Sequence, residues 1–244
     1  MVRLILCLIA VILFLILFIP VLILEWVLGK RRPDLRDISS MHIIHGIFRI
    51  VLFLAGVKVT VKGKEKIPRD QAVLYIANHR SIFDILVIYT QFQIPTSFIA
   101  KKELARIPLL ASWMRMIRCL FLDRKDMRQG MKIILTAIDY IKEGLCVCIF
   151  PEGTRSKSKD ESELLAFHEG SFRVATRTGC PIVPVSINNT ASVFEDHLPF
   201  IRSAHVILEF LDPIYPAALS REEQKHLGEQ TRQLIMVAIK KNHE

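Results

Sequence analysis

The chain has 244 residues, of which 51% are hydrophobic, and it carries a formal net charge of +9 at neutral pH. This length is enough for one membrane segment and one sizeable domain, and the hydrophobic fraction is higher than a soluble protein needs. The composition therefore argues against a purely soluble chain, and the charge predicts acidic partners.

The hydrophobic excess is concentrated at the N-terminus. Residues 4–24 form a run of 21 residues without a charge, which meets the length of about 20 that a helix needs to cross a bilayer core. A signal peptide has a shorter apolar core and a small-residue cleavage site, and the stretch EWVLGKRR that follows offers no such site. We therefore predict an uncleaved membrane helix, with Trp26 near the interface.

A second apolar segment covers residues 41–57. His42, His45 and Arg49 recur in it at spacings of three and four, so they form one polar stripe along a helix. This pattern favours an interfacial or re-entrant helix over a second crossing. Residues 1–57 are thus predicted to form the N-terminal membrane-anchoring helices.

Basic residues lie between the two apolar segments, at Lys30, Arg31, Arg32 and Arg36. The positive-inside rule places such a loop in the cytoplasm, and residues 58–244 would then lie on the cytoplasmic face of the cell membrane. Nucleic acid is the obvious acidic partner of a soluble basic protein. Beside a membrane anchor we expect lipid headgroups instead and no nucleic acid, because each basic residue near an anionic surface gains roughly 1 kcal/mol.

The cysteines indicate a reducing compartment and no metal site. They are odd in number and lie mostly in apolar surroundings, as expected for buried thiols of a cytosolic domain; they are Cys7, Cys119, Cys146, Cys148 and Cys180. The CVC pair lacks the spacing of a zinc site and has no nearby His-x-x-x-His partner. We predict no bound metal.

After residue 57, short apolar runs alternate with amphipathic stretches. The predicted strands are residues 57–63, 72–77, 96–100, 119–123, 145–150, 182–187 and 205–211. The predicted helices are residues 81–91, 104–115, 127–143, 169–178 and 220–240. Alternation of this kind predicts an α/β domain over residues 58–244, with a mixed, largely parallel sheet flanked by helices. Ligands of such domains bind at the carboxyl ends of the strands.

The first chemical motif is NHRSIFD, residues 78–84, directly after a predicted strand. On one continuous helix, His79 and Asp84 would point in different directions, so they can meet only across a turn. If Ser81 caps a new helix, Asp84 falls in its first turn and can hold the Nδ1 proton of His79, leaving Nε2 to accept a proton from a hydroxyl. The alternative is that Ser81 and Asp84 merely cap the helix and His79 is a turn residue.

The second motif is FPEGTRS, residues 150–156, after another predicted strand. Gly153 lets the backbone approach a ligand closely, while the Thr154 hydroxyl and the Arg155 guanidinium can bind phosphate oxygens. Glu152 can orient Arg155 or bind a substrate hydroxyl. The alternative is an ordinary turn with a surface ion pair.

Two weaker features accompany these motifs. Arg124 follows the strand in CLFLDR and can complete a phosphate clamp as a second arginine at a strand end. Pro184 interrupts the β-rich run of CPIVPVSI, and a proline within a strand favours an edge strand or a bulge.

Taken in order, NHRSIFD, CLFLDR, FPEGTRS and VPVSI resemble the four sequence blocks of the glycerolipid acyltransferase family, in particular the 1-acylglycerol-3-phosphate (lysophosphatidic acid) acyltransferases. The preceding FIAKKEL, residues 98–104, is also similar to that family. The similarity covers roughly residues 58–212. The first and third blocks are close matches, and the second and fourth are looser.

The resemblance implies that His79 is a general base oriented by Asp84. It also implies that glycerol phosphate is bound by Arg124 from the second block and by Glu152, Gly153 and Arg155 from the third. A Lys or other residue often stands in the family where this chain has His168, so His168 is a departure, and we assign it no catalytic role.

The expected reaction is acyl transfer from acyl-CoA or acyl carrier protein to the sn-2 hydroxyl of lysophosphatidic acid, giving phosphatidic acid without a cofactor, in phospholipid biosynthesis. Membrane lipids are the other expected partners. Two alternatives remain open: another lysophospholipid or a lyso-aminolipid as the acceptor, or a non-catalytic lipid-binding membrane protein. A hydrolase is disfavoured because the chain contains no G-x-S-x-G motif.

Overall fold

The computed structural model describes residues 1–243. Within this range the chain opens with the helices α1 (Val2–Leu17), α2 (Ile19–Arg31) and α3 (Pro33–Ala55). α1 and α2 are bent by 54° relative to each other, so the prediction of one continuous helix over residues 4–24 is wrong. The reason is Pro20 in the first turn of α2, which has no backbone N–H and clashes with the carbonyl one turn earlier.

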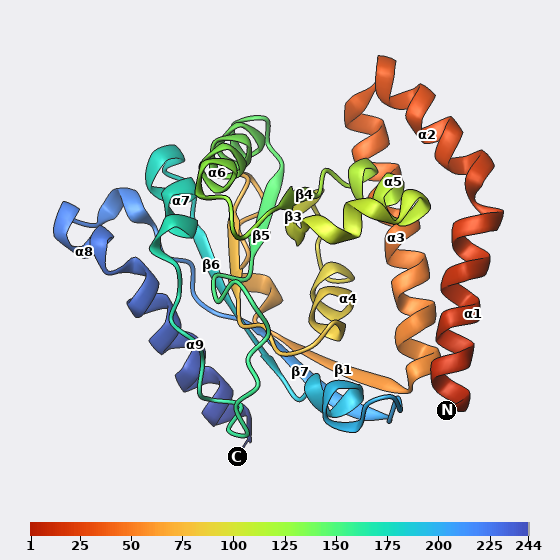
Figure 1. Ribbon diagram of the computed structural model, residues 1–244. Helices are drawn as coiled ribbons and strands as arrows, with labels where there is room; N and C mark the ends of the chain where they lie inside the picture. The colour runs from red at the N-terminus through yellow and green to blue at the C-terminus, as the bar shows by residue number, and fades with distance from the viewer. Residues whose placement is uncertain (244) are drawn as a thin grey trace.

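α3 begins well before residue 41, where the second apolar segment was predicted to start. By length and composition α3 can cross a membrane, and α1 with α2 meets the same criterion as one bent pair. The inner side of α3, with Met41, Ile44 and Val51, is buried in the same core as the central sheet. These apolar helices fit association with a membrane, and they also pack as part of one folded body with the sheet (Figure 1).

Seven strands form one sheet within residues 1–243, in the order β1-β7-β6-β2-β5-β3-β4. They are β1 (Val57–Lys62), β2 (Leu74–Ala77), β3 (Thr96–Lys101), β4 (Leu120–Leu122), β5 (Cys146–Ile149), β6 (Ile182–Asn188) and β7 (Ala204–Phe210). β6 and β7 pair antiparallel, and the other neighbours pair parallel. The predicted mixed, largely parallel α/β fold is confirmed.

The central strands β2, β5 and β6 are buried along their whole length because helices cover both faces of the sheet. On β2, Tyr75 and Ala77 point into the core shared with α3, α4 (Phe83–Tyr89) and α5 (Pro108–Met116). Leu74 and Ile76 point into the opposite core, which is shared with three other helices (Figure 1). Those helices are α6 (Met127–Lys142), α7 (Arg173–Thr178) and α9 (Leu227–His243).

Three predicted helices are interrupted. The helix expected over residues 169–178 starts as a 3-10 turn, Glu169–Phe172, and becomes α-helical only at Arg173. The helix expected over residues 104–115 starts as a 3-10 turn, Lys102–Arg106, and becomes α-helical only at Pro108. Proline forces the residue before it out of the helical region, and Ile107 is indeed extended. The helix expected over residues 220–240 is divided at His226 into α8 (Arg221–Lys225) and α9, while the predicted capping box at its start is present.

Pro184 lies in β6, between β2 and β7, so the edge-strand alternative is wrong. The bulge alternative fits, because the antiparallel pairing shifts by one residue between Val185–Phe210 and Ile182–Ile214, on either side of Pro184. The carbonyl of Pro184 points toward β7 and accepts from the N–H of Leu211 at 2.9 Å. Since β7 ends at Phe210, no strand carbonyl on that side needs the N–H that proline lacks. The sheet therefore tolerates a proline in an interior strand.

Candidate active site

The turn between β2 and α4 is tied to β6 by a buried asparagine. Asn78 donates from Nδ2 to the carbonyl of Ile187 at 2.9 Å, and its Oδ1 accepts from the N–H of Ile187 at 2.8 Å. The side-chain amide thus matches one backbone unit of the neighbouring strand with both a donor and an acceptor. The sequence contains Asn78 within the first motif but gives no sign of this partner.

His79 and Asp84 meet across that turn. Nδ1 of His79 lies 2.8 Å from Oδ2 of Asp84, and the Asp84 side chain is fully buried. Because an ionised carboxylate only accepts, Nδ1 carries the proton and Nε2 is the free acceptor of the neutral ring. The His79 ring stacks on Phe150 with a centroid distance of 4.3 Å, which fixes its plane.

Asp84 also organises the turn itself. Its Oδ2 accepts from the backbone N–H groups of Arg80 at 2.7 Å and Ser81 at 2.8 Å, and its Oδ1 accepts from the hydroxyl of Thr190. Ser81 accepts from the N–H of Phe83 at 3.0 Å, which supports the start of α4. The capping alternative and the His-Asp pair are therefore both present, and one carboxylate serves both.

The loop that follows β5 forms hydrogen bonds with both the N–H and the carbonyl of His79. The N–H of His79 donates to Oε1 of Glu152 at 2.7 Å, and the His79 carbonyl accepts from the N–H of Ser156 at 2.8 Å. The second oxygen of Glu152 accepts from the N–H of Leu165 at 3.0 Å. Burial raises the pKa of Glu152, and the two backbone N–H groups oppose that shift. Both oxygens of Glu152 thus contact protein backbone, which indicates positioning rather than substrate binding.

Arg155 and Thr154 are exposed at the tip of this loop. Nη1 of Arg155 lies 2.7 Å from Oε1 of Glu195, so the expectation that Glu152 orients Arg155 is wrong. Glu195 belongs to the connection between β6 and β7, and the same oxygen accepts from the N–H of Ile82 at 2.9 Å. Glu195 therefore links the third sequence block to the start of α4.

Gly153 has a backbone φ of +68°, a conformation that strongly favours glycine. A side chain at this position would also meet the ring of His168, since a Cβ there would lie 3.1 Å from its Nε2. His168 thus lies against the third block, a contact that no pattern in the sequence predicts.

Arg124 lies farther from the His-Asp pair. It follows β4 and is exposed, and the neighbouring Asp123 pairs with Lys102, which lowers the pKa of that carboxyl. β4 and β2 are parallel and end at the same edge of the sheet, but two strands lie between them. At a spacing of about 4.8 Å per strand, Arg124 is displaced by roughly 14 Å along that edge. The structure brings His79, Asp84, Glu152, Gly153 and Arg155 together and places Arg124 at the periphery.

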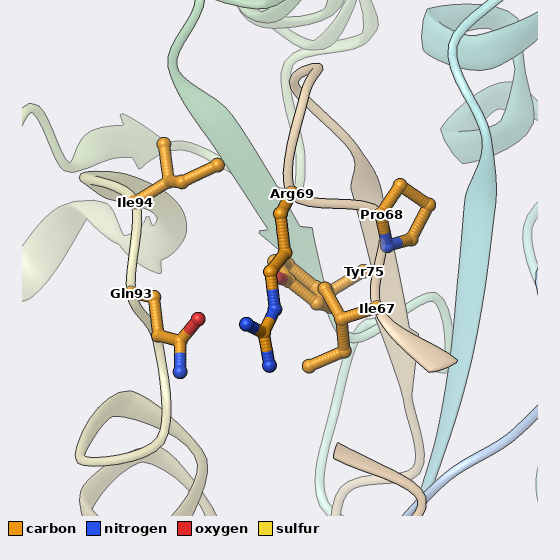
Figure 2. A pocket seen from close by; sticks show the side chains of 6 residues that line it. All are labelled: Ile67, Pro68, Arg69, Tyr75, Gln93 and Ile94. Carbon is orange, nitrogen blue, oxygen red and sulfur yellow. The ribbon is translucent and has the colours of Figure 1, made fainter. Parts of the chain in front are cut away.

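The opposite edge of the sheet contains a separate pocket of about 210 Å³. Figure 2 shows Arg69 and Gln93 reaching toward the space between two segments that precede β2 and β3. Tyr75 forms part of the lining. Because these segments lie at the amino ends of parallel strands, the pocket does not belong to the site around His79.

Comparison with known proteins agrees with this geometry. The chain matches the acyltransferase family model over residues 58–188. It is 31% identical to the 1-acyl-sn-glycerol-3-phosphate acyltransferase of Borreliella burgdorferi, over 81% of this chain and 78% of that one. It is 27% identical to the enzyme of the same name from Saccharomyces cerevisiae, over 79% of this chain and 63% of that one.

A solved structure is similar over nearly the whole length. The crystal structure of the 1-acyl-sn-glycerophosphate (LPA) acyltransferase PlsC from Thermotoga maritima covers 99% of this chain, with a TM-score of 0.82 and 25% identity. This chain covers 95% of that structure. The N-terminal helices are therefore included in the similarity, together with the α/β part. The resemblance seen in the four sequence blocks is confirmed, and the chain belongs to the acyltransferase family.

Proposed function

We propose that this acyltransferase transfers an acyl group from a thioester to the sn-2 hydroxyl of 1-acylglycerol 3-phosphate, giving phosphatidic acid. The observation that carries the proposal is the 2.8 Å contact between Nδ1 of His79 and the buried carboxylate of Asp84. It supports a neutral imidazole with Nε2 ready to accept the hydroxyl proton. The names of the relatives from Borreliella burgdorferi and Saccharomyces cerevisiae support the choice of acceptor.

In the proposed reaction, Nε2 of His79 removes the proton of the sn-2 hydroxyl as its oxygen attacks the thioester carbonyl. The imidazolium that forms is stabilised by Asp84. When the tetrahedral intermediate collapses, the carbon–sulfur bond breaks, and the imidazolium returns the proton to the departing thiolate. Thioesters are already activated, so a positioned base and stabilisation of the oxyanion suffice.

The phosphate of the acceptor is assigned to the exposed tip of the third block. Arg155 offers a planar guanidinium, Thr154 a hydroxyl, and Gly153 a backbone that a ligand can approach. Arg124 is a further phosphate contact in this proposal, from the periphery of the site. Glu152 is reassigned to positioning, because both of its oxygens accept from the backbone.

The amphiphilic acceptor also accounts for the apolar N-terminus. A lysolipid holds its acyl chain in the bilayer and its phosphate at the surface, so a site docked on the membrane meets both parts. We place the catalytic part on the cytoplasmic face, where acyl-CoA and acyl carrier protein are the candidate donors. The basic residues between α2 and α3 support this orientation.

The test is product analysis with purified full-length protein. A panel of lysophospholipids and a lyso-aminolipid is incubated with acyl-CoA or acyl carrier protein donors, and the products are identified by mass spectrometry. We expect phosphatidic acid from lysophosphatidic acid, and no product from folded His79→Ala protein. Preference for another lysolipid would replace the proposed acceptor. Near-normal turnover by His79→Ala would exclude the mechanism.

A further inference from the structure

A short loop at the active-site end exposes large apolar side chains. Residues 194–203, here called the rim loop, form the second part of the connection between β6 and β7. Leu198 is 63% exposed and Phe200 is 45% exposed, and the adjacent Ile82 at the start of α4 is 50% exposed. Large apolar side chains gathered on one surface mark a contact with another apolar phase or partner.

The rim loop is fixed to the catalytic residues on one side. Oε1 of Glu195 contacts both Nη1 of Arg155 at 2.7 Å and the N–H of Ile82 at 2.9 Å. Backbone hydrogen bonds also brace the loop, from Phe200 N–H to the His197 carbonyl at 2.7 Å. The exposed side chains are thus held beside the His79 turn by a defined set of contacts.

On its other side, the rim loop touches the N-terminal helices. A Cβ built on Gly56, at the end of α3, would lie 3.1 Å from Cβ of Ser203 and 3.2 Å from the guanidinium carbon of Arg3 in α1. Figure 1 shows the segment before β7 near the N-terminus of α1, at the end of the molecule where α4 begins. Near this end of α3, Phe53 is also 82% exposed.

We propose that the rim loop docks on the surface of an anionic bilayer and seats Leu198 and Phe200 in its interface. Two features favour this occupant: large apolar side chains are also exposed on α1 and α3, and the chain carries a net charge of +9. On the loop itself, the exposed Arg202 balances the exposed Asp196. Docking at this place turns the His79 turn toward the lipid surface. The inference rests on the proposed function, in that the acceptor resides in a membrane.

The first experiment measures contact with lipid independently of turnover. Leu198→Cys and Phe200→Cys are labelled with an environment-sensitive NBD dye in the full-length protein; all five native cysteines lie in the described range and are buried. Leu135→Cys on α6 is the matched control, because Leu135 is 56% exposed on the opposite face of the sheet.

The labelled proteins are reconstituted into vesicles of phosphatidylcholine and phosphatidylglycerol. We expect a blue shift at positions 198 and 200, with quenching by lipids that carry a nitroxide high on the acyl chain. Position 135 should show neither effect. Equal, water-like fluorescence at all three positions would overturn the proposal, whatever the enzyme's activity.

The second experiment separates docking from chemistry. The double variant Leu198→Asp/Phe200→Asp should acylate bilayer-embedded lysophosphatidic acid at least about tenfold more slowly, because the loss of even one fully buried large apolar side chain corresponds to about a tenfold change. Its rate on a short-chain acceptor dissolved as monomers should stay within about twofold of the parent, since the base and the phosphate contacts are unchanged. Leu135→Asp should change neither rate.

The outcomes of the two experiments are distinguishable. Equal loss on both acceptors would show that the rim loop supports the folded site, and it would refute docking. If the parent protein acylates neither the bilayer-embedded nor the short-chain lysophosphatidic acid, the proposed function is refuted. The NBD labels would still report whether the rim loop enters the bilayer.

Discussion

At the scale of single residues, the carboxylate of Asp84 both stabilises the turn after β2 and contacts His79, the proposed base. Asp84→Asn should keep the fold, because the amide oxygen can replace Oδ2 and the amide nitrogen can donate to the Thr190 hydroxyl, which then accepts. The charge that stabilises the imidazolium is lost, so we expect kcat to fall by about 10³ to 10⁴. Steady-state kinetics and a melting curve measure the two effects.

Thr190→Val is the matched control for that substitution. It removes the hydroxyl that donates to Oδ1 of Asp84 and leaves a buried acceptor without this partner, so it should cost about 1–3 kcal/mol of stability. The carboxylate and its contact with His79 remain, and much of the activity should too. The contrary outcome is that Asp84→Asn loses as much stability as Thr190→Val and still has a kcat no lower than that of Thr190→Val. That result would show that the charge of Asp84 has no special role in catalysis.

The second prediction at this scale concerns Glu152. Glu152→Gln replaces one accepting oxygen with an amide donor that faces a backbone N–H, of either His79 or Leu165. One hydrogen bond is lost and His79 shifts, so kcat should fall while KM for the acceptor changes little. Kinetics with each substrate varied in turn check this. A raised acceptor KM with unchanged kcat would show that Glu152 binds substrate after all.

Arg155 gives the third prediction. If it grips the acceptor phosphate, Arg155→Ala should raise KM for lysophosphatidic acid about ten- to over a hundredfold, since a charge-assisted contact contributes about 1.5–3 kcal/mol. Lys should restore only part of the affinity, because it lacks the planar fork. KM for the acyl donor should stay nearly constant.

Glu195→Gln is the control for Arg155, because it removes the charge that pairs with the guanidinium. We expect the acceptor KM of Glu195→Gln to stay the same or to decrease. If Arg155 merely holds the loop, both variants should melt at lower temperature, and the kinetics of both substrates should deteriorate alike.

At the scale of elements, an ion-pair cluster fastens α3 to the catalytic part. Asp37 in α3 is almost completely buried and contacts Nη2 of Arg118 at 3.1 Å, just before β4. Arg118 also contacts Glu143 at 3.3 Å, where the carboxylate is half exposed. Asp37→Ala should destabilise the protein by about 3 kcal/mol, because two partly buried arginines lose their partner. Glu143→Ala should cost less than about 1 kcal/mol.

Chemical denaturation in detergent micelles compares the two variants. Equal, small losses would show that α3 is held to the sheet by apolar packing alone. A large loss confined to Asp37→Ala would show that this carboxylate fastens the N-terminal helices to the sheet.

The elements themselves could be read from the sequence because local chemistry determines them. β5 is an apolar run that is buried on both faces, and β6 is buried along its whole length although it contains Ser186. The bend at Pro20 is also legible in the sequence, because a proline inside an apolar run interrupts a helix. The local structure at a residue is thus predictable where the residues that determine it are nearby in the chain.

The partners within the site were predictable only over short range. His79 and Asp84 are five residues apart, whereas Thr190 and Asp84 are separated by 106 positions. Thr190 and Glu195 approach the turn only because β6 lies beside β2, and strand order does not follow chain order. Neither residue belongs to a periodic pattern, so the sequence offered no signal for them.

At the scale of the whole molecule, we infer the orientation in the membrane from the distribution of charge. The basic residues between α2 and α3 favour the cytoplasm, and the net charge of +9 suits an anionic leaflet. The bent pair α1–α2 and the helix α3 pack on the sheet as one folded body. The side of the membrane on which these helices lie is therefore also the side on which the catalytic part lies.

The prediction at this scale is that residues 58–243 face the cytoplasm. Lys159 is exposed in the loop after β5, and the five native cysteines are buried, so Lys159→Cys provides one accessible thiol with little background. In intact cells, a membrane-impermeant maleimide should leave Lys159→Cys unlabelled, because the bilayer separates the reagent from the loop. The same reagent should label it after permeabilisation, and that labelling is the positive control. Labelling in intact cells equal to that in permeabilised cells would place the catalytic part outside, away from both candidate thioester donors.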